Sequence, residues 1–403
     1  MNIPSSWQIL PLQKVAKLQT GLALNSKLKI LCPVCVPYLR VANVQAGHIE
    51  LGDLKTVVIE SSTMQRFVLH PGDVLLTEGG DFDKLGRGAV WRGQISPCLH
   101  QNHVFAIRTD RLKLLPEFLS YQTESNYGRN YFLSCSKQST NLASINSTQI
   151  KNFPVIVPPL NEQRRIAEFL GTWDEAIEKL EQLIAAKEKR LNWIRFYVLT
   201  GRIRLDKYSK RWELQRLSNI LHEHGTKSSG HEVVHSVSVH KGVVNQIEHL
   251  GRNFSAKDTS NYNLAKSGDI IYTKSPTGDF PYGIIKMNQN KYNVIVSPLY
   301  GVFTPDYPEL GIWLDCYFEA PENTNNYLHP IIQKGAKNTI NITNKTFLSN
   351  SLFLPTERAE AQAICRIISV VKTELKLLQQ ELTALQKQKR GLMQKLLTGT
   401  WRV

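Results

Sequence analysis

The sequence lacks a segment that could cross a membrane. No run of about 18 or more apolar residues occurs, and residues 1–17 contain no apolar stretch of the signal-peptide kind. The six cysteines are scattered, which is usual for proteins of a reducing compartment. We therefore expect a cytoplasmic protein.

The sequence also lacks the motifs that bind cofactors and metals. It contains no G-x-x-x-x-G-K-[ST] phosphate loop, no G-x-G-x-x-G loop after a strand and no Asn/Asp-Pro-Pro-aromatic segment for a target base. The single C-x-x-C, Cys32 to Cys35, has no second cysteine or histidine pair to complete a zinc site, and we expect it to lie in a loop. We therefore expect no catalytic residue, metal site or cofactor in this chain, so that any catalysis comes from a partner.

One segment, His231-Glu232-Val233-Val234-His235, does match the H-E-x-x-H pattern of zinc proteases. That chemistry needs both histidines on one face of a helix, four residues apart. Here the segment follows Ser228-Ser229-Gly230 and runs into Val237-Ser238-Val239, an alternation that favours a strand. An enzyme that uses these histidines and a metal is therefore the weaker alternative.

Positive charge is what the chain has in excess. It contains 49 Lys and Arg against 34 Asp and Glu, a net charge of +15 with a pI near 9.5. The hydrophobic content of 42% is normal for a globular protein. This balance favours a folded protein that binds a polyanion such as nucleic acid.

Two long stretches repeat apolar residues at alternating steps of four and three. The first contains Ile166, Leu170, Trp173, Ile177, Leu180, Ile184, Lys187, Leu191, Ile194 and Val198. The second contains Ile364, Ile368, Val371, Leu375, Leu378, Leu382, Leu385, Lys389, Leu392 and Leu396, each 198 residues after its counterpart. Such spacing is typical of a helix that packs along another helix, so we expect a coiled coil whose seam runs roughly 50 Å.

We expect the pair to be antiparallel, because the region between the two helices should bring its ends together, as compact domains usually do. In the register that places Ile166 opposite Leu396, Lys187 lies opposite Leu375 and Lys389 opposite Trp173. Both lysines would then lie off-centre and could snorkel towards water. Two unrelated helices, each buried against its own domain, are the alternative.

The repeat extends beyond these helices. Four short motifs occur in the same order in both halves. They are W-x-[IL]-x-x-L at Trp7 and Trp212, Gly-Asp at Gly72 and Gly268, Gly-Asp-Phe at Gly80 and Gly278, and Leu-Thr-Gly at Leu199 and Leu397. The chain therefore reads as two half-repeats. We expect similar domains at residues 1–157 and 205–354, followed by long helices within residues 158–204 and 355–403.

Short β-branched runs separated by Gly, Pro, Asn and Asp predict mixed α+β domains. The expected strands are Lys55–Glu60, Val74–Thr77, Val104–Arg108, Val155–Val157, Val233–Val239, Asp269–Thr273 and Ile284–Lys286, and the expected short helices are Pro116–Gln122 and Tyr307–Cys316. Gly201 and Gly399 should end the long helices as left-handed caps.

The connection after each Gly-Asp strand is polar, glycine-bearing and basic. Lysine and arginine side chains can contact phosphates or guanine, and amide side chains suit adenine. The candidate DNA-binding residues are Lys84, Arg87, Arg92, Gln101, Asn102, Lys274, Asp279, Tyr282 and Lys286. Each taken alone is explained equally well as part of a solvated hairpin tip, whereas the matching position in both halves favours binding.

These features resemble the specificity (S) subunit of type I restriction-modification enzymes over essentially the whole chain. The segment from Pro158 to Ile166, PPLNEQRRI, is similar to the family's P-P-L-x-E-Q-x-x-I helix start, and Leu199-Thr200-Gly201 to its helix end. The Gly72–Leu75 turn and the loops Asp83–Arg87 and Ser275–Ile284 also look like those of its target-recognition domains. The second helix start departs from the pattern, with Glu360-Ala361-Gln362 in place of Glu-Gln.

The resemblance implies a non-catalytic DNA-binding subunit. Each target-recognition domain would read one half of a bipartite site in double-stranded DNA, and the antiparallel helices would act as a spacer and as the docking surface for two methyltransferase subunits. S-adenosylmethionine would belong to those subunits, and ATP and Mg to restriction subunits where these are present. The alternative is a coiled-coil scaffold that binds nucleic acid through charge alone.

Overall fold

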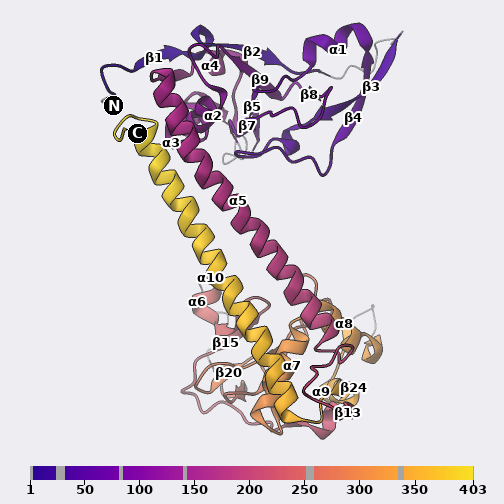
Figure 1. Ribbon diagram of the computed structural model, residues 1–403. Coiled ribbons are helices and arrows are strands. Elements are labelled where there is room, and N and C mark those ends of the chain that lie inside the picture. The colour runs from indigo at the N-terminus through magenta and orange to yellow at the C-terminus, as the bar shows by residue number, and fades with distance from the viewer. Residues whose placement is uncertain are drawn as a thin grey trace. The chain divides into compact units, whose positions relative to one another are not determined.

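The computed structural model describes residues 3–23, 32–80, 85–138, 143–250, 258–334 and 340–402. The chain divides into unit 1, residues 1–181 with 381–403, and unit 2, residues 182–380. Each unit contains one α+β domain, here domain 1 and domain 2, and a part of both long helices (Figure 1). Within the described part of the chain, no helix combines the length and apolar character needed to span a membrane.

The long helices are α5 (Leu160–Tyr197) and α10 (Arg358–Leu396). The shorter helices are α1 (Ser61–Phe67), α2 (Pro116–Glu124), α3 (Asn126–Cys135) and α4 (Ser147–Lys151) in domain 1, and α6 (Gln246–Leu250), α7 (Pro308–Phe318), α8 (Pro321–Leu328) and α9 (Asn344–Ser349) in domain 2.

The strands of domain 1 are β1 (Gln8–Pro11), β2 (Ala16–Thr20), β3 (Pro33–Leu39), β4 (Lys55–Glu60), β5 (Val74–Thr77), β6 (Gly79–Gly80), β7 (Gly88–Val90), β8 (Leu99–His100), β9 (Val104–Thr109), β10 (Lys137–Gln138), β11 (Ala143–Ser144) and β12 (Pro154–Val157). Those of domain 2 are β13 (Glu213–Arg216), β14 (Leu221–Glu223), β15 (His235–Ser238), β16 (Gly242–Asn245), β17 (Asn263–Ala265), β18 (Ile270–Tyr272), β19 (Ile285–Met287), β20 (Val294–Val296), β21 (Gly301–Pro305), β22 (Gln333–Lys334), β23 (Ile340–Asn341) and β24 (Ser351–Leu354).

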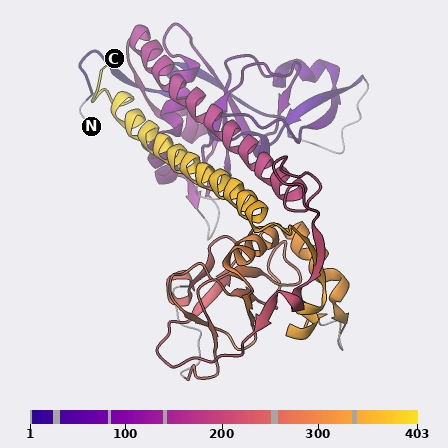
Figure 2. The ribbon, with the colours of Figure 1, turned by 60° about the horizontal axis from the view of Figure 1, so that its bottom comes forward.

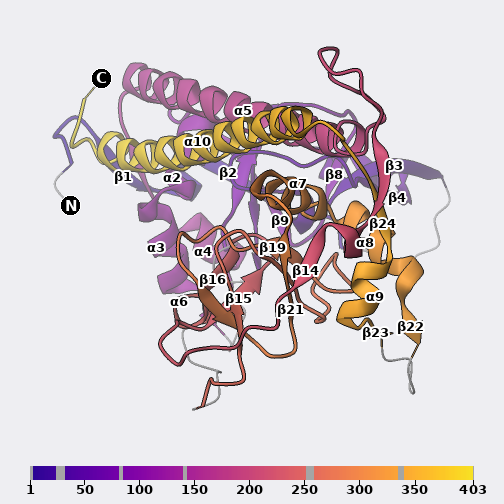
Figure 3. The same cartoon turned by 90° about the horizontal axis from the view of Figure 1, so that it is seen from below.

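Both domains are built around the same antiparallel sheet. Its strand order is β2-β9-β5-β7 in domain 1 and β14-β21-β18-β19 in domain 2, part of which is labelled in Figure 3. In both domains a separate two-stranded sheet, β1-β12 or β13-β24, joins the start of the domain to the strand before the long helix. The helices after the sheet also recur in order, α2-α3-α4 and α7-α8-α9. The duplication and the α+β fold predicted from the sequence are confirmed.

The domains differ outside this shared sheet. Domain 1 adds the sheet β4-β3-β8, and domain 2 adds the pairs β15-β16 and β17-β20. The C-x-x-C segment belongs to the first addition: Cys35 lies in β3 and Cys32 directly precedes it, so the expected loop is wrong. Both thiols are free and exposed.

The H-E-x-x-H segment is not helical. Residues 231–233 are irregular, Val234 forms an isolated bridge with Ile295, and β15 begins at His235. Glu232 accepts hydrogen bonds from Ser228 and Ser229. Searched over the described residues, the structure places no three His, Cys, Asp or Glu side chains where they could share a metal ion. The geometry that a zinc protease requires is therefore not present in this segment.

The core of domain 1 extends into both long helices. Phe118, Phe132 and Phe153 pack in one buried cluster with Ile166 and Leu170 of α5 and with the Met393–Leu397 end of α10. Because this cluster contains turns of both helices, burial of apolar surface fixes the helix pair against the domain within unit 1.

The helices pair in antiparallel fashion within each unit, and both views show them side by side (Figures 1 and 2). In unit 1, Lys389 Nζ lies 2.5 Å from Asp174 Oδ1. In unit 2, Lys187 Nζ lies 2.5 Å from Glu374 Oε1. Both contacts fall within one residue of the predicted register, and every residue of the two apolar stripes is buried or half-buried.

The expected snorkelling of the two lysines is wrong. Lys389 is buried, with 7% of the residue exposed, and Lys187 is half-buried. Both ammonium groups face carboxylates rather than the apolar residues one position away. An ion pair inside the seam is possible because its geometry is close and each charge has a partner.

Both long helices end at glycines in the left-handed region, as predicted. The φ angles of Gly201 and Gly399 are +70° and +74°. A Cβ atom would lie 2.7 Å from the Trp212 ring at Gly201 and 2.4 Å from Pro4 at Gly399. Only glycine combines this conformation with such a close approach of the following segment to the domain.

We predict that Leu180→Asp lowers the free energy of unfolding by about 3 kcal/mol, because it places an unpaired charge in the seam. Leu183→Asp is the matched control, since Leu183 lies on the same helix with 43% of the residue exposed. Urea unfolding followed by circular dichroism measures both. Equal, small losses in the two variants would contradict the seam.

Candidate nucleic-acid interface

The candidate loops occupy equivalent places in the two domains. In domain 1 the loop connects β5 to β7, and in domain 2 it connects β18 to β19, the corresponding strands of the shared sheet. Lys84 lies outside the described residues. The other candidates can be placed.

Glycines fix the domain 1 loop against the core. Gly79 pairs with Ser144 of β11, and a Cβ atom there would lie 2.2 Å from the carbonyl oxygen of Ala143. Gly86 has a φ of +62° and packs on the Phe132 ring. Arg87 follows at once, half-buried, and its carbonyl accepts from the Thr77 amide at 2.9 Å. Arg87 therefore lies at the base of the loop on rigid backbone.

The turn between β8 and β9 carries the amide candidates. Gln101 and Asn102 are half-buried, and Arg92, after β7, is exposed. The preceding His100 is fully buried, and burial lowers the pKa of its imidazole, which contacts the Val104 carbonyl at 2.7 Å through Nδ1. His100 is thus a neutral structural residue, whereas Gln101 and Asn102 have surface to offer a ligand.

A histidine–carboxylate contact that the sequence did not predict joins these two loops. The carboxylate of Glu78 contacts Nδ1 of His103, and the Glu78 amide donates to the His103 carbonyl at 2.9 Å. Nε2 of His103 lies 3.4 Å from the Asn102 side chain. Glu78 and His103 are 25 positions apart in sequence and belong to no motif, so only the fold reveals their contact.

The domain 2 loop is a tight turn with an exposed tip. Thr277 and Phe280 exchange backbone hydrogen bonds of 3.1 and 2.9 Å, and the Phe280 side chain is buried. Lys274 and Asp279 are exposed on either side. The Asn325 side chain of α8 donates to the Asp279 carbonyl at 3.0 Å, which ties the tip to the domain.

The remaining two candidates differ in accessibility. Tyr282 is half-buried beside the His329 ring, with 5.9 Å between ring centroids. Lys286 is buried, with 5% of the residue exposed, and faces Asp315, whose pKa burial raises and the lysine charge lowers. Lys286 is therefore nearly inaccessible to DNA, which disfavours its predicted role as a DNA-binding residue.

A second feature, the clasp, recurs at the start of each long helix. Glu162 accepts from Trp7 Nε1 at 3.2 Å and from Arg402 at 2.6 Å. Glu360, fully buried, accepts from Trp212 Nε1 at 2.9 Å and from Arg204 at 2.6 and 2.7 Å.

The clasps correct the interpretation of the second helix start. Its departure from Glu-Gln leaves the acid unchanged, since Glu360 lies 198 residues after Glu162 and has equivalent partners. The residue that differs is the glutamine, because Ala361 stands where the first half has Gln163. In unit 1, Gln163 accepts from the Leu115 amide and donates to the Lys113 and Pro158 carbonyls.

Each domain also holds the long helix of the other half through a carboxylate, which we call its anchor. In domain 1, Glu124 at the end of α2 lies 3.6 Å from Lys389 of α10. Asp174 of α5 bonds the same lysine and accepts from the Tyr121 hydroxyl at 2.6 Å. In domain 2, Glu319 after α7 lies 2.8 Å from both Arg195 of α5 and Lys372 of α10.

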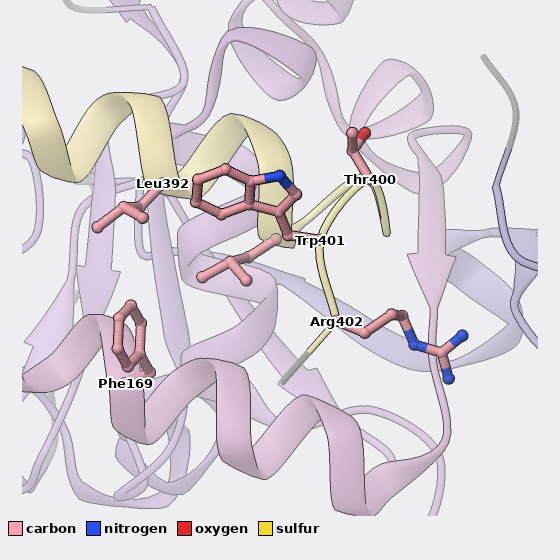
Figure 4. A pocket seen from close by; sticks show the side chains of 6 residues that line it. Phe169, Leu392, Thr400, Trp401 and Arg402 are labelled. Carbon is pink, nitrogen blue, oxygen red and sulfur yellow. The ribbon is translucent and has the colours of Figure 1, made fainter.

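An open pocket of about 390 Å³ lies at the C-terminal end of α10 in unit 1 (Figure 4). It is lined by Phe169, Leu392, Leu396, Thr400, Trp401 and Arg402. Lys395 lies over the Trp401 ring at 3.7 Å from its centroid. The lining is mostly apolar and holds no cluster of acids or histidines, which suits packing rather than catalysis.

The fold matches that of known type I specificity subunits. The HsdS subunit from Thermoanaerobacter tengcongensis superposes with a TM-score of 0.51 at 16% identity, covering 100% of this chain and 99% of that one. The S subunit from M. genitalium gives 0.54 at 14% identity over 98% and 96%. The fold is thus the duplicated two-domain architecture of these subunits.

Sequence comparison agrees in the first half. Residues 4–188 match the type I restriction modification DNA specificity domain. The chain is 27% identical over 191 residues to the putative MjaX specificity subunit of Methanocaldococcus jannaschii, and 30% identical over 151 residues to the EcoKI specificity subunit of Escherichia coli. These matches cover 47% and 36% of this chain but only 44% and 32% of the relatives. The predicted resemblance is confirmed: residues 4–188 are similar to this specificity domain, and the fold is similar to that of known S subunits.

We predict that Glu360→Gln lowers the free energy of unfolding by about 2–4 kcal/mol, because the buried Arg204 contact loses its charge partner. Glu357→Gln, which alters a pair separated by 4.0 Å with an exposed Lys210, should cost under about 0.5 kcal/mol. Chemical denaturation of both variants measures the difference. A Glu360→Gln variant as stable as the control would show that the clasp does not stabilise unit 2.

Proposed function

We propose that this chain is a sequence-specific DNA-binding specificity subunit that reads a bipartite site in double-stranded DNA. The observation that carries the proposal is the recurrence, in both domains, of a polar, glycine-bearing connection between corresponding strands of the same sheet. A strongly cationic chain with two such loops suits two separate contacts with a duplex.

The residues assigned to base or phosphate contact fall into two sets. In domain 1 they are Arg87, Arg92, Gln101 and Asn102, and in domain 2 Lys274, Asp279 and Tyr282; Lys84 remains a candidate from the sequence. Arginine and lysine suit guanine or phosphate, the amides adenine, and Asp279 the amino group of cytosine. The sets differ in chemistry, which favours two different half-sites.

The catalytic role is assigned to partners. Exposed apolar residues follow the long helices: Phe169, Leu183, Trp193 and Phe196 on α5, and Ile367, Val370 and Leu377 on α10. Such a surface suits two methyltransferase subunits, with restriction subunits as further partners. S-adenosylmethionine, ATP and Mg would then belong to those subunits, and the assembly would act in the cytoplasm.

The competing function is a scaffold that binds nucleic acid through its charge alone. It predicts affinity that falls steeply with salt but is indifferent to sequence. A competition assay with the methyltransferase partner present separates the two, using duplexes from sites whose adenine methylation depends on this gene. If these duplexes compete no better than random duplexes, the scaffold is correct.

We predict that Arg87→Ala weakens binding about 10- to 100-fold through one half-site only, because a bidentate base contact contributes about 1–3 kcal/mol. Lys274→Ala is the reciprocal variant and should affect only the other half-site. Binding to duplexes with either half-site scrambled measures this selectivity. Loss of partner assembly in Arg87→Ala would argue for a structural role instead.

A further inference from the structure

Because the chain is duplicated, each long helix resembles its own partner. The apolar stripes have the same spacing, and the clasps are equivalent at both ends. Apolar seam positions and clasps alone would therefore accept two copies of α5, or two copies of α10, from different molecules. The charged residues between the clasps do not share this equivalence.

We propose that these interior charges select pairing of α5 with α10 and reject pairing of either helix with a second copy of itself. The selecting contacts are Lys389 with Asp174 and Glu124, Lys187 with Glu374, and Arg195 with Glu319. This inference concerns how the chain pairs its own helices and does not depend on DNA recognition.

The offset of 198 residues shows what an α5–α5 pair would contain. Leu191 would replace Lys389 beside Asp174 and Glu124, leaving both acids without their cation. Ala176 would replace Glu374 opposite Lys187. Both ion pairs would thus be lost, and a charge held in a seam without its partner is strongly unfavourable.

Arg195 makes this pairing worse, because its counterpart is Met393. Met393 is 2% exposed within the apolar core of domain 1. A second α5 would therefore place the Arg195 guanidinium in that core. In unit 2 the same arginine is satisfied by Glu319, so it fits one domain and not the other.

An α10–α10 pair is disfavoured by the same positions. Lys372 is the counterpart of Asp174, so Lys389 of the second copy would meet a like charge. Leu385 would stand opposite Glu374, and Met393 would replace Arg195 beside Glu319. Only the heterotypic pair satisfies all the charges, as a buried polar residue does when it specifies a coiled-coil partner.

The test exchanges the cations between the helices of the full-length chain. The exchange variant carries Leu191→Lys, Lys389→Leu, Arg195→Met and Met393→Arg, so its composition and net charge are unchanged. The matched control, Lys389→Arg with Arg195→Lys, keeps a cation at both native positions. Light scattering over a wide range of protein concentration and thermal unfolding are measured for both and for the wild type.

We expect a monomeric wild type and control, and an exchange variant whose Tm falls by about 4 °C or more or that dimerises with rising concentration. A monomeric exchange variant with the wild-type Tm overturns the proposal, and so does a wild-type dimer crosslinked α5 to α5.

If the exchange variant does not fold, variants that reverse the charges of one ion pair test the proposal instead. Lys187→Glu and Glu374→Lys should each lower the Tm, and the double variant should restore most of the loss. A double variant no more stable than the worse single variant shows that these charges do not recognise each other, which also overturns the proposal.

Discussion

A carboxylate buried at the start of each long helix is the interaction on which the rest of the structure depends. Glu162 and Glu360 each accept from a tryptophan at the beginning of their own domain and from an arginine beyond the end of the other long helix. Within each unit, one acid thus connects both halves of the chain. A buried carboxylate is tolerable only with charged and hydrogen-bonded partners, so the three groups must assemble together.

This constraint explains how loops with little structure of their own can be positioned. The core of domain 1 includes turns of both long helices, and the loop glycines pack directly on that core through Phe132 and β11. Arg87 and the Glu78–His103 pair therefore lie on backbone that adjoins a core shared with both long helices. In domain 2 the hydrogen bond from Asn325 to the Asp279 carbonyl ties the corresponding loop to its own domain. Positioning of this kind is what recognition by loops requires.

Local and periodic features could be predicted from the sequence, whereas partners across the fold could not. The stripes and the offset between them predicted both helices and their register, because a 4-3 repeat over more than four heptads is typical of two long helices packed along each other. The burial of Lys286 could not be predicted, because the residues around it in sequence do not show which face of β19 the domain covers. The Glu78–His103 pair and the acids that hold Lys389 depend on segments far apart in sequence, where no spacing rule applies. The equivalence of Glu360 with Glu162 follows from the offset of 198 residues and is hidden when the two motifs are compared letter by letter.

The ends and the interior of the helix pair have different roles, because a duplicated chain must pair α5 with α10 and not with a second copy of the same helix. Because the clasps are equivalent, the glutamate at either helix start can bind the arginine that follows either long helix. The clasps therefore stabilise a helix pair without selecting which helix is the partner. Choice must come from positions of the long helices where the halves have diverged. These are Asp174, whose counterpart is Lys372, and Arg195, whose counterpart is Met393. Charged groups suit this task because a mismatch leaves a desolvated charge, a larger difference in free energy than an altered apolar contact provides. Under the proposed function this choice matters, since a self-paired helix would bring together two identical domains.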